Sequence, residues 1–95
     1  MIEIKLEPSP SSCIETVAKR EYERVLSMLL KGDREDRRLE EELELLRLFL
    51  ESADFGRLRS ISEDFLLDGR RVEFILKSTD SLPGYEVGIK DYKET

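Results

Sequence analysis

The side chain with the clearest chemical potential is Cys13, which stands where the sequence predicts the first turn of a helix. The helix dipole lowers the pKa of a thiol at this position because it favours the thiolate. Arg20 and Arg24 fall near the same helical sector and would act in the same direction. The chain has no histidine, however, and cysteine catalysis generally recruits an adjacent base. Two interpretations stay open: a reactive thiol, or a small residue at a helix start.

The composition removes most other catalytic options. The chain contains no histidine, asparagine, glutamine or tryptophan. It therefore lacks an imidazole for proton transfer or zinc binding, and an amide for an oxyanion hole. The single cysteine excludes both an intrachain disulfide and a cysteine-based zinc site. Phosphate-binding loops and the common hydrolase motifs are also missing. We predict no catalytic residues, no metal and no cofactor.

The acidic residues are concentrated in the middle of the chain. The formal net charge is −6, and residues 33–56 hold nine acids against four bases. Five of these acids share one stripe at helical spacing, interrupted by Arg47 alone: Asp36, Glu40, Glu44, Glu51 and Asp54. Such a row could bind a hard cation, form local ion pairs on a solvated face, or attract a basic protein. Metal binding is disfavoured because ligands on one exposed helix splay apart. We predict that the stripe is a partner face.

Arginines gather around the Asp68-Gly69 pair, where the sequence predicts a β-hairpin. They are Arg57, Arg59, Arg70 and Arg71. Together with Tyr85 or Tyr92 they suggest a sheet that binds single-stranded RNA. Acids are interleaved with these arginines, which favours cross-strand ion pairing instead. The acidic overall balance also argues against phosphate binding, so we predict no direct contact with nucleic acid.

The first half of the chain reads as one strand followed by two helices. Apolar and charged residues alternate over residues 2–6, which is typical of a strand with one buried face. Ser12 and Glu15 have the spacing of a capping box, which predicts a helix from about residue 12 to residue 31. Asp33 or Asp36 can cap a second helix that runs to about residue 53.

The second half reads as three strands. The Asp68-Gly69 pair between two apolar runs predicts a hairpin with a type I′ turn. A last strand with alternating apolar residues follows the Leu82-Pro83-Gly84 turn. The predicted order is β-α-α-β-β-β in a single α+β domain over residues 1–95, with an antiparallel sheet packed against two helices.

A second copy is predicted to complete or cover this sheet. Both predicted hairpin strands are apolar on both faces, and the second helix carries a second apolar sector. The residues assigned to the dimer interface are Leu45, Leu48, Phe49, Leu66 and Ile75.

In size, charge and element order, the whole chain resembles an orphan archaeal α+β protein that forms an intertwined homodimer with interdigitated sheets. No diagnostic motif carries this resemblance, so no functional residue transfers. The resemblance implies an obligate dimer without an established activity, and it is compatible with association with a basic molecule.

The sequence therefore predicts a non-enzymatic acidic homodimer that binds a basic protein. No secretory signal or membrane span is evident, so we expect a cytoplasmic protein without membrane contact. Absence of heat-labile amides and a charged fraction of 40% are typical of thermophilic proteins. Two alternatives stay open: a small enzyme using carboxylates or Cys13 in a dimer cleft, and a structural subunit of a larger complex.

Overall fold

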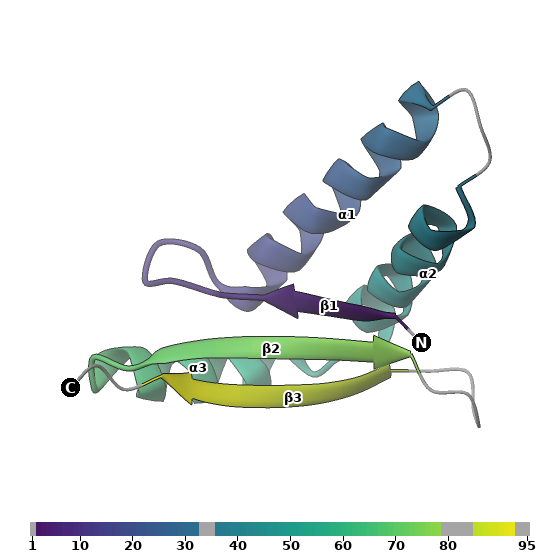
Figure 1. Ribbon diagram of the computed structural model, residues 1–95. Coiled ribbons are helices and arrows are strands. Elements are labelled where there is room, and N and C mark those ends of the chain that lie inside the picture. Colours follow the sequence, from purple (N-terminus) through teal and green to yellow (C-terminus); the bar gives the residue numbers. More distant parts are fainter. Residues whose placement is uncertain (1, 33–35, 79–84, 93–95) are drawn as a thin grey trace.

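The computed structural model describes residues 2–32, 36–78 and 85–92 (Figure 1). The elements in chain order are β1 (Glu3–Leu6), α1 (Ile14–Lys31), α2 (Arg37–Ser52), α3 (Phe55–Leu67), β2 (Arg71–Ser78) and β3 (Tyr85–Tyr92). The predicted α+β class with an antiparallel sheet is confirmed. The predicted order differs at one element, because the chain runs β-α-α-α-β-β and the sheet packs against three helices.

The sheet has the order β1-β2-β3, with both neighbouring pairs antiparallel. Ile4 lies opposite Leu76, and Phe74 lies opposite Ile89. Seen from the sheet in Figure 1, α3 runs behind β2 and β3, while α1 and α2 form a pair that extends away from β1. The strands therefore have a helix-facing side and an outer side, and the side chains alternate between them.

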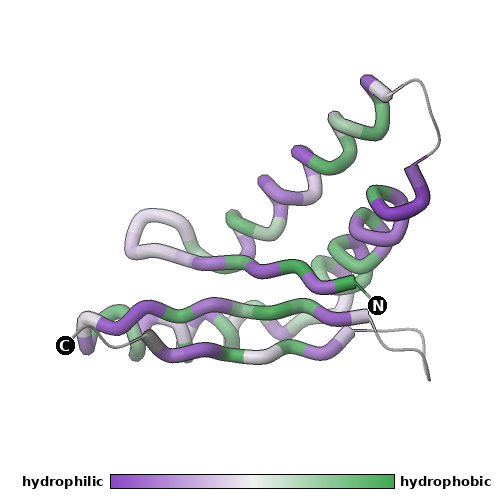
Figure 2. Tube along the Cα trace, in the orientation of Figure 1, coloured by the Kyte–Doolittle hydropathy of each residue, from purple (hydrophilic) through white to green (hydrophobic). Residues whose placement is uncertain are grey.

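The core lies on the helix-facing side of the sheet. Its buried members are Ile2, Ile4, Leu6, Ile14, Ala18, Val25, Leu45, Leu46, Phe49, Val72, Phe74 and Leu76. Figure 2 shows the corresponding alternation of hydrophobic and hydrophilic residues along β1 and β2. The alternation in β1 and the helical stripe of α1, both predicted from the sequence, account for the members that these two elements contribute. One cluster thus joins the sheet, α1 and α2.

Local hydrogen bonds explain where the first two helices begin. The predicted capping box at Ser12 is wrong, because Ser12 pairs with Ser9 across a tight turn through backbone bonds of 2.9 and 3.1 Å. The N-cap of α1 is Cys13, whose side chain makes no capping bond. Asp36 does cap α2, since its Oδ1 accepts from the N–H of Leu39 at 3.2 Å. The alternative cap, Asp33, lies outside the described residues.

The predicted hairpin around Asp68-Gly69 is wrong, because the segment before it is the helix α3. Asp54 caps this helix by accepting from the N–H of Arg57 at 3.2 Å. Gly69 has a φ of 72° and follows the helix end, where its N–H donates to the carbonyl of Leu66 at 3.1 Å. A type I′ turn needs positive φ at both central residues, whereas Asp68 has a φ of −81°. An Asp-Gly pair suits a helix C-terminus as well as a hairpin, because both need a glycine in the left-handed region.

The hairpin of this fold joins β2 to β3 instead. Its strands pair from Arg71 opposite Tyr92 to Ser78 opposite Tyr85. The predicted turn at Leu82-Pro83-Gly84 lies outside the described residues. Residues 65–67 are helical, so they do not form the apolar strand that was predicted to need cover from a second copy on both faces. None of the described helices is long and apolar enough to cross a membrane.

Candidate functional site

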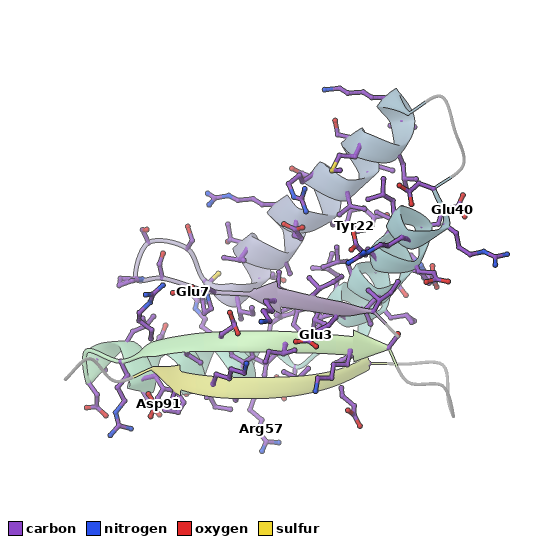
Figure 3. The ribbon with its side chains drawn as sticks, viewed as in Figure 1. Glu3, Glu7, Tyr22, Glu40, Arg57 and Asp91 are labelled. Atoms are coloured by element: carbon purple, nitrogen blue, oxygen red, sulfur yellow. The ribbon has the colours of Figure 1, made fainter. Side chains whose placement is uncertain are left out.

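The predicted acidic stripe lies on α2 and at the N-cap of α3. Asp36 and Asp54 are the caps described above. Arg47 lies between Glu44 and Glu51 and forms an ion pair with each, the one to Glu51 at 2.9 Å. Figure 3 labels Glu40, an exposed residue near the N-terminal end of α2 and far from the sheet. We name these five carboxylates the acidic α2 face: Asp36, Glu40, Glu44, Glu51 and Asp54.

The acidic α2 face stays negative despite its local bonds. It holds five carboxylates and includes one guanidinium, that of Arg47, which gives a formal net charge of −4. The hydrogen bond from Arg47 holds the pKa of Glu44 below its usual range, which keeps that carboxylate ionised. Among the described residues no three acidic or cysteine side chains cluster closely enough to hold a metal ion.

A second candidate site is an open pocket of about 570 Å³ beside Cys13. It lies between the loop before α1, the first turn of α1 and one side of α3. Its lining combines polar and apolar side chains, and is made of Ser9, Pro10, Ser11, Cys13, Thr16, Arg59, Ser62, Glu63, Leu66 and Leu67. We name this cavity the Cys13 pocket.

The thiol of Cys13 is held in a setting that favours the thiolate. Its Sγ lies 3.3 Å from the Oγ1 of Thr16. The pKa of Cys13 is lowered, first by this hydroxyl, then by the N–H of Thr16 and by the positive charge of Arg59, although partial burial opposes the shift. The carboxylate in the lining, Glu63, pairs with Arg59 at 3.5 Å. The pocket thus offers a thiol with a lowered pKa, a hydroxyl and a cation to a small ligand.

The cation beside Cys13 is not one that the sequence indicated. Arg20 donates to the hydroxyl of Ser12 at 3.1 Å, and Arg24 pairs with Glu21. Arg59 takes their place because α3 packs against α1. The predicted hairpin placed a strand directly before Asp68-Gly69, so it gave no indication that a helix carries Arg59 to Cys13. The signal that could have revealed it is Asp54, a capping residue directly before an apolar pattern with helical spacing.

The arginines assigned to a nucleic-acid surface are mostly paired with acids. Arg59 pairs with Glu63, Arg70 with Asp91 at 3.1 Å, and Arg71 with Glu7 at 2.7 Å. Figure 3 places Glu7 and Asp91 near the same end of the sheet. Two of these pairs tie the start of β2 to the chain on either side of it, and their acids, Glu7 and Asp91, lie far from the arginines in the sequence.

The residues assigned to a dimer interface lie in different parts of the fold. Leu45 and Phe49 belong to the core, with exposed fractions of 2% and 0%. Ile75 is buried on the outer side of the sheet, opposite Lys5 and Gly88. Leu66 lines the Cys13 pocket, and Leu48 is half-buried on α2. Dimerisation through these residues stays a prediction.

Comparison with known proteins supports the archaeal resemblance. An uncharacterized protein of Archaeoglobus fulgidus is 57% identical to this chain over 49 residues. The match covers 50% of this chain and 58% of the relative, so it spans less than two thirds of that protein. No solved structure matches the chain. A family model matches residues 1–87, which include β1, all three helices, β2 and part of β3. The chain therefore belongs to the family that this model describes.

Proposed function

We propose that this protein is a non-catalytic cytoplasmic homodimer that captures a basic protein on the acidic α2 face. One observation carries the proposal: α2 buries Leu45, Leu46 and Phe49 in the core on one side and presents the acidic α2 face on another. The position of these carboxylates is set by the packing of the helix, so the negative surface is present before a partner arrives.

Physical considerations favour a protein partner over a metal. The carboxylates lie along the helix instead of converging on one point, which suits a row of lysines or arginines better than a single cation. A net charge of −4 on one face speeds the approach of a basic surface, and the effect weakens as salt shortens the screening length to about 8 Å at physiological ionic strength. Two copies, each with a formal charge of −6, strengthen the attraction.

The test replaces charges on the acidic α2 face and uses a lysine-rich peptide as the probe. The triple variant E40K/E44K/E51K should weaken binding of the peptide at least about tenfold at low salt, an effect of about 1.4 kcal/mol. Fluorescence anisotropy over a range of salt concentrations measures it. The matched control is E3K/E15K/E23K, which makes the same change in net charge at exposed acids on β1 and α1. Equal loss in both variants would show that only total charge matters and would refute the proposal.

Capture of a physiological partner is measured in the same variants. Wild-type and variant proteins, each immobilised, are exposed to an extract of the native organism. A basic protein retained by the wild type and by the control, but lost from the triple variant, supports the proposal. A retained protein that binds all three equally, and whose retention ignores salt, contradicts it.

A second candidate function is favoured by the Cys13 pocket. A thiol with a lowered pKa, a hydroxyl and the guanidinium of Arg59 line one cavity of about 570 Å³. This arrangement supports binding of a small electrophilic or anionic molecule at Cys13, and with it the enzyme alternative. The reactivity of the thiol, developed in the Discussion, separates this function from partner capture.

A further inference from the structure

One long edge of the sheet has no pairing partner within the described part of the chain. β3 pairs with β2 on one side only, over the register from Tyr85 to Tyr92 (Figure 1). The opposite edge strand, β1, is half as long, with 4 residues against 8. An edge strand directs the N–H and C=O of every second residue outward, where another strand can pair with them. The edge of β3 is therefore a template for pairing with a further chain.

The charges on the outer side of the sheet alternate in sign from strand to strand. Glu3 lies opposite Lys77, and Lys77 lies opposite Glu86. Further along the same two strands, Glu73 lies opposite Lys90. Glu86 and Lys90 are exposed and stand on the free edge strand. Opposite charges directly across a sheet stabilise it and like charges destabilise it, so a neighbouring strand is favoured when it continues this alternation.

The sequence of β3 continues the alternation when it meets itself. In antiparallel pairing, residues directly opposite one another alternate between hydrogen-bonded and non-hydrogen-bonded pairs, and their side chains point to the same side of the sheet, so each symmetric register has its two-fold axis at one residue. With the axis at Gly88, Glu86 faces Lys90 of the other copy, and the reverse pair forms by symmetry. With the axis at Val87, Glu86 instead faces Gly88. The register centred on Gly88 is therefore the one that satisfies both charges.

The same register also matches the helix-facing side of the strand. It places Val87 opposite Ile89 of the other copy. Ile89 is 41% exposed and, with Val87, lines an open groove of about 370 Å³ between α3 and β3. Leu58 and Ile61 of α3 line the same groove. With the axis at Ile89, Val87 would face Asp91, an apolar group against a charge. The helix-facing side therefore disfavours the axis at Ile89, and the outer side disfavours the axis at Val87, which leaves the axis at Gly88.

We propose that two copies of this chain join through antiparallel pairing of their β3 strands about an axis at Gly88, forming one continuous six-stranded sheet. The inference rests on the homodimer proposed above and names the surface that forms it. In the joined sheet the outer row Glu3, Lys77, Glu86 continues into Lys90 and Glu73 of the second copy, so charges alternate across the axis. Of the acidic α2 face, Asp54 lines the groove beside β3, whereas the charges exchanged in the binding test, Glu40, Glu44 and Glu51, lie on α2.

A cross-linking experiment tests the register. Gly88→Cys in a Cys13→Ser background brings two thiols face to face across the axis, at a Cα separation of about 4.5–5.5 Å, which a disulfide spans. A Cβ at Gly88 lies 3.8 Å from the Cβ of Ile75, an ordinary contact, so the strand accepts the side chain. Mild oxidation should give a covalent dimer at high yield. Glu86→Cys in the same background is the control, because its two copies lie about 13 Å apart in this register.

A charge exchange tests the same contact without cross-linking. E86K and K90E each place two like-charged pairs across the axis and should raise the dimer dissociation constant at least about tenfold. In an equal mixture of the two variants, each cross-axis pair of the mixed dimer again joins a lysine to a glutamate, so this dimer should recover the wild-type affinity. A folding defect within one chain would not recover on mixing. E3K, which changes the charge opposite Lys77 at the far edge, should leave the dissociation constant unchanged.

The outcomes separate this inference from the proposed function. Analytical ultracentrifugation that shows a monomer throughout the micromolar range refutes both the dimer and the β3 contact, and leaves Glu86 and Lys90 as charges that protect a free edge. A dimer that ignores E86K and K90E, and whose Gly88→Cys variant does not cross-link, refutes the β3 contact alone. Capture of the lysine-rich peptide is measured separately and depends on neither result.

Discussion

Replacing Phe49 by alanine should be one of the most destabilising single changes in this chain. The ring is fully buried and meets Phe55 edge to face, with centroids 5.3 Å apart and an interplanar angle of 78°. It also meets Tyr85 at 5.4 Å and 90°. One side chain on α2 thereby joins the start of α3 and the start of β3. Its loss affects three elements that are distant in sequence.

The expected loss in the free energy of unfolding is about 3–5 kcal/mol for truncation of a buried phenylalanine. The two edge-to-face contacts, worth about 0.5–1.5 kcal/mol each, place the value toward the upper end. A chain of this length has a total stability of roughly 5–14 kcal/mol. The variant should therefore stay folded in the cold, with a midpoint of thermal unfolding lowered by roughly 15–30 °C.

Urea unfolding followed by far-UV circular dichroism measures the loss, with Leu48→Ala, a half-buried neighbour, as the control of smaller effect. A double-mutant cycle with Tyr85→Leu should give a coupling of about 0.5–1.5 kcal/mol, because the two rings touch. A loss below about 1 kcal/mol would refute the reasoning. A Phe49→Ala variant that unfolds at the same urea concentration as the wild type but dissociates to monomers in the ultracentrifuge would also refute the reasoning, because Phe49 would then act at an interface between copies.

Three further predictions concern local features and overall stability. Gly69→Ala should lower the free energy of unfolding in urea by about 1 kcal/mol, because the φ of 72° is strained for alanine although no atom crowds the new methyl group. Gly69→Asn should recover part of this loss, because asparagine tolerates the left-handed region better. Equal stability of all three forms would contradict the prediction. Alkylation of Cys13 should reach half its maximal rate at a lower pH than alkylation of free cysteine, because the Thr16 hydroxyl lowers the pKa of the thiol. Thr16→Val should move this pH–rate profile to higher pH. Identical profiles for Cys13 and free cysteine would show that the surroundings do not lower the pKa of the thiol. Because the pKa of Cys13 is lower in the folded than in the unfolded chain, ionisation of the thiol stabilises the fold at high pH. This stabilisation is lost as the pH falls through the folded pKa. Calorimetry should give a thermal midpoint above the mesophile range of about 45–65 °C, and a midpoint within that range would contradict the thermophile interpretation.

The sequence determined those elements whose signals are local. Strict alternation predicted β1, and the apolar spacing predicted the helices α1 and α2. Asp36 was recognisable as a cap because a capping bond reaches only to a residue three positions along the chain. The acidic α2 face followed in the same way, since residues three and four apart on a helix share a face wherever the helix packs. Such features depend on neighbours in sequence, so no tertiary knowledge is needed.

Only the tertiary structure decided what depends on distant segments. The run Phe65-Leu66-Leu67 before Asp68-Gly69 suits a strand and a helix end equally, and the packing of α3 against α1 and β2 selects the helix. That packing brings Arg59 to Cys13, which no spacing in the sequence indicates. It also buries Phe49, and it leaves β3 at the edge of the sheet. An apolar or charged residue shows that it needs a neighbour, but which neighbour it meets is settled when the whole chain competes for the same buried volume.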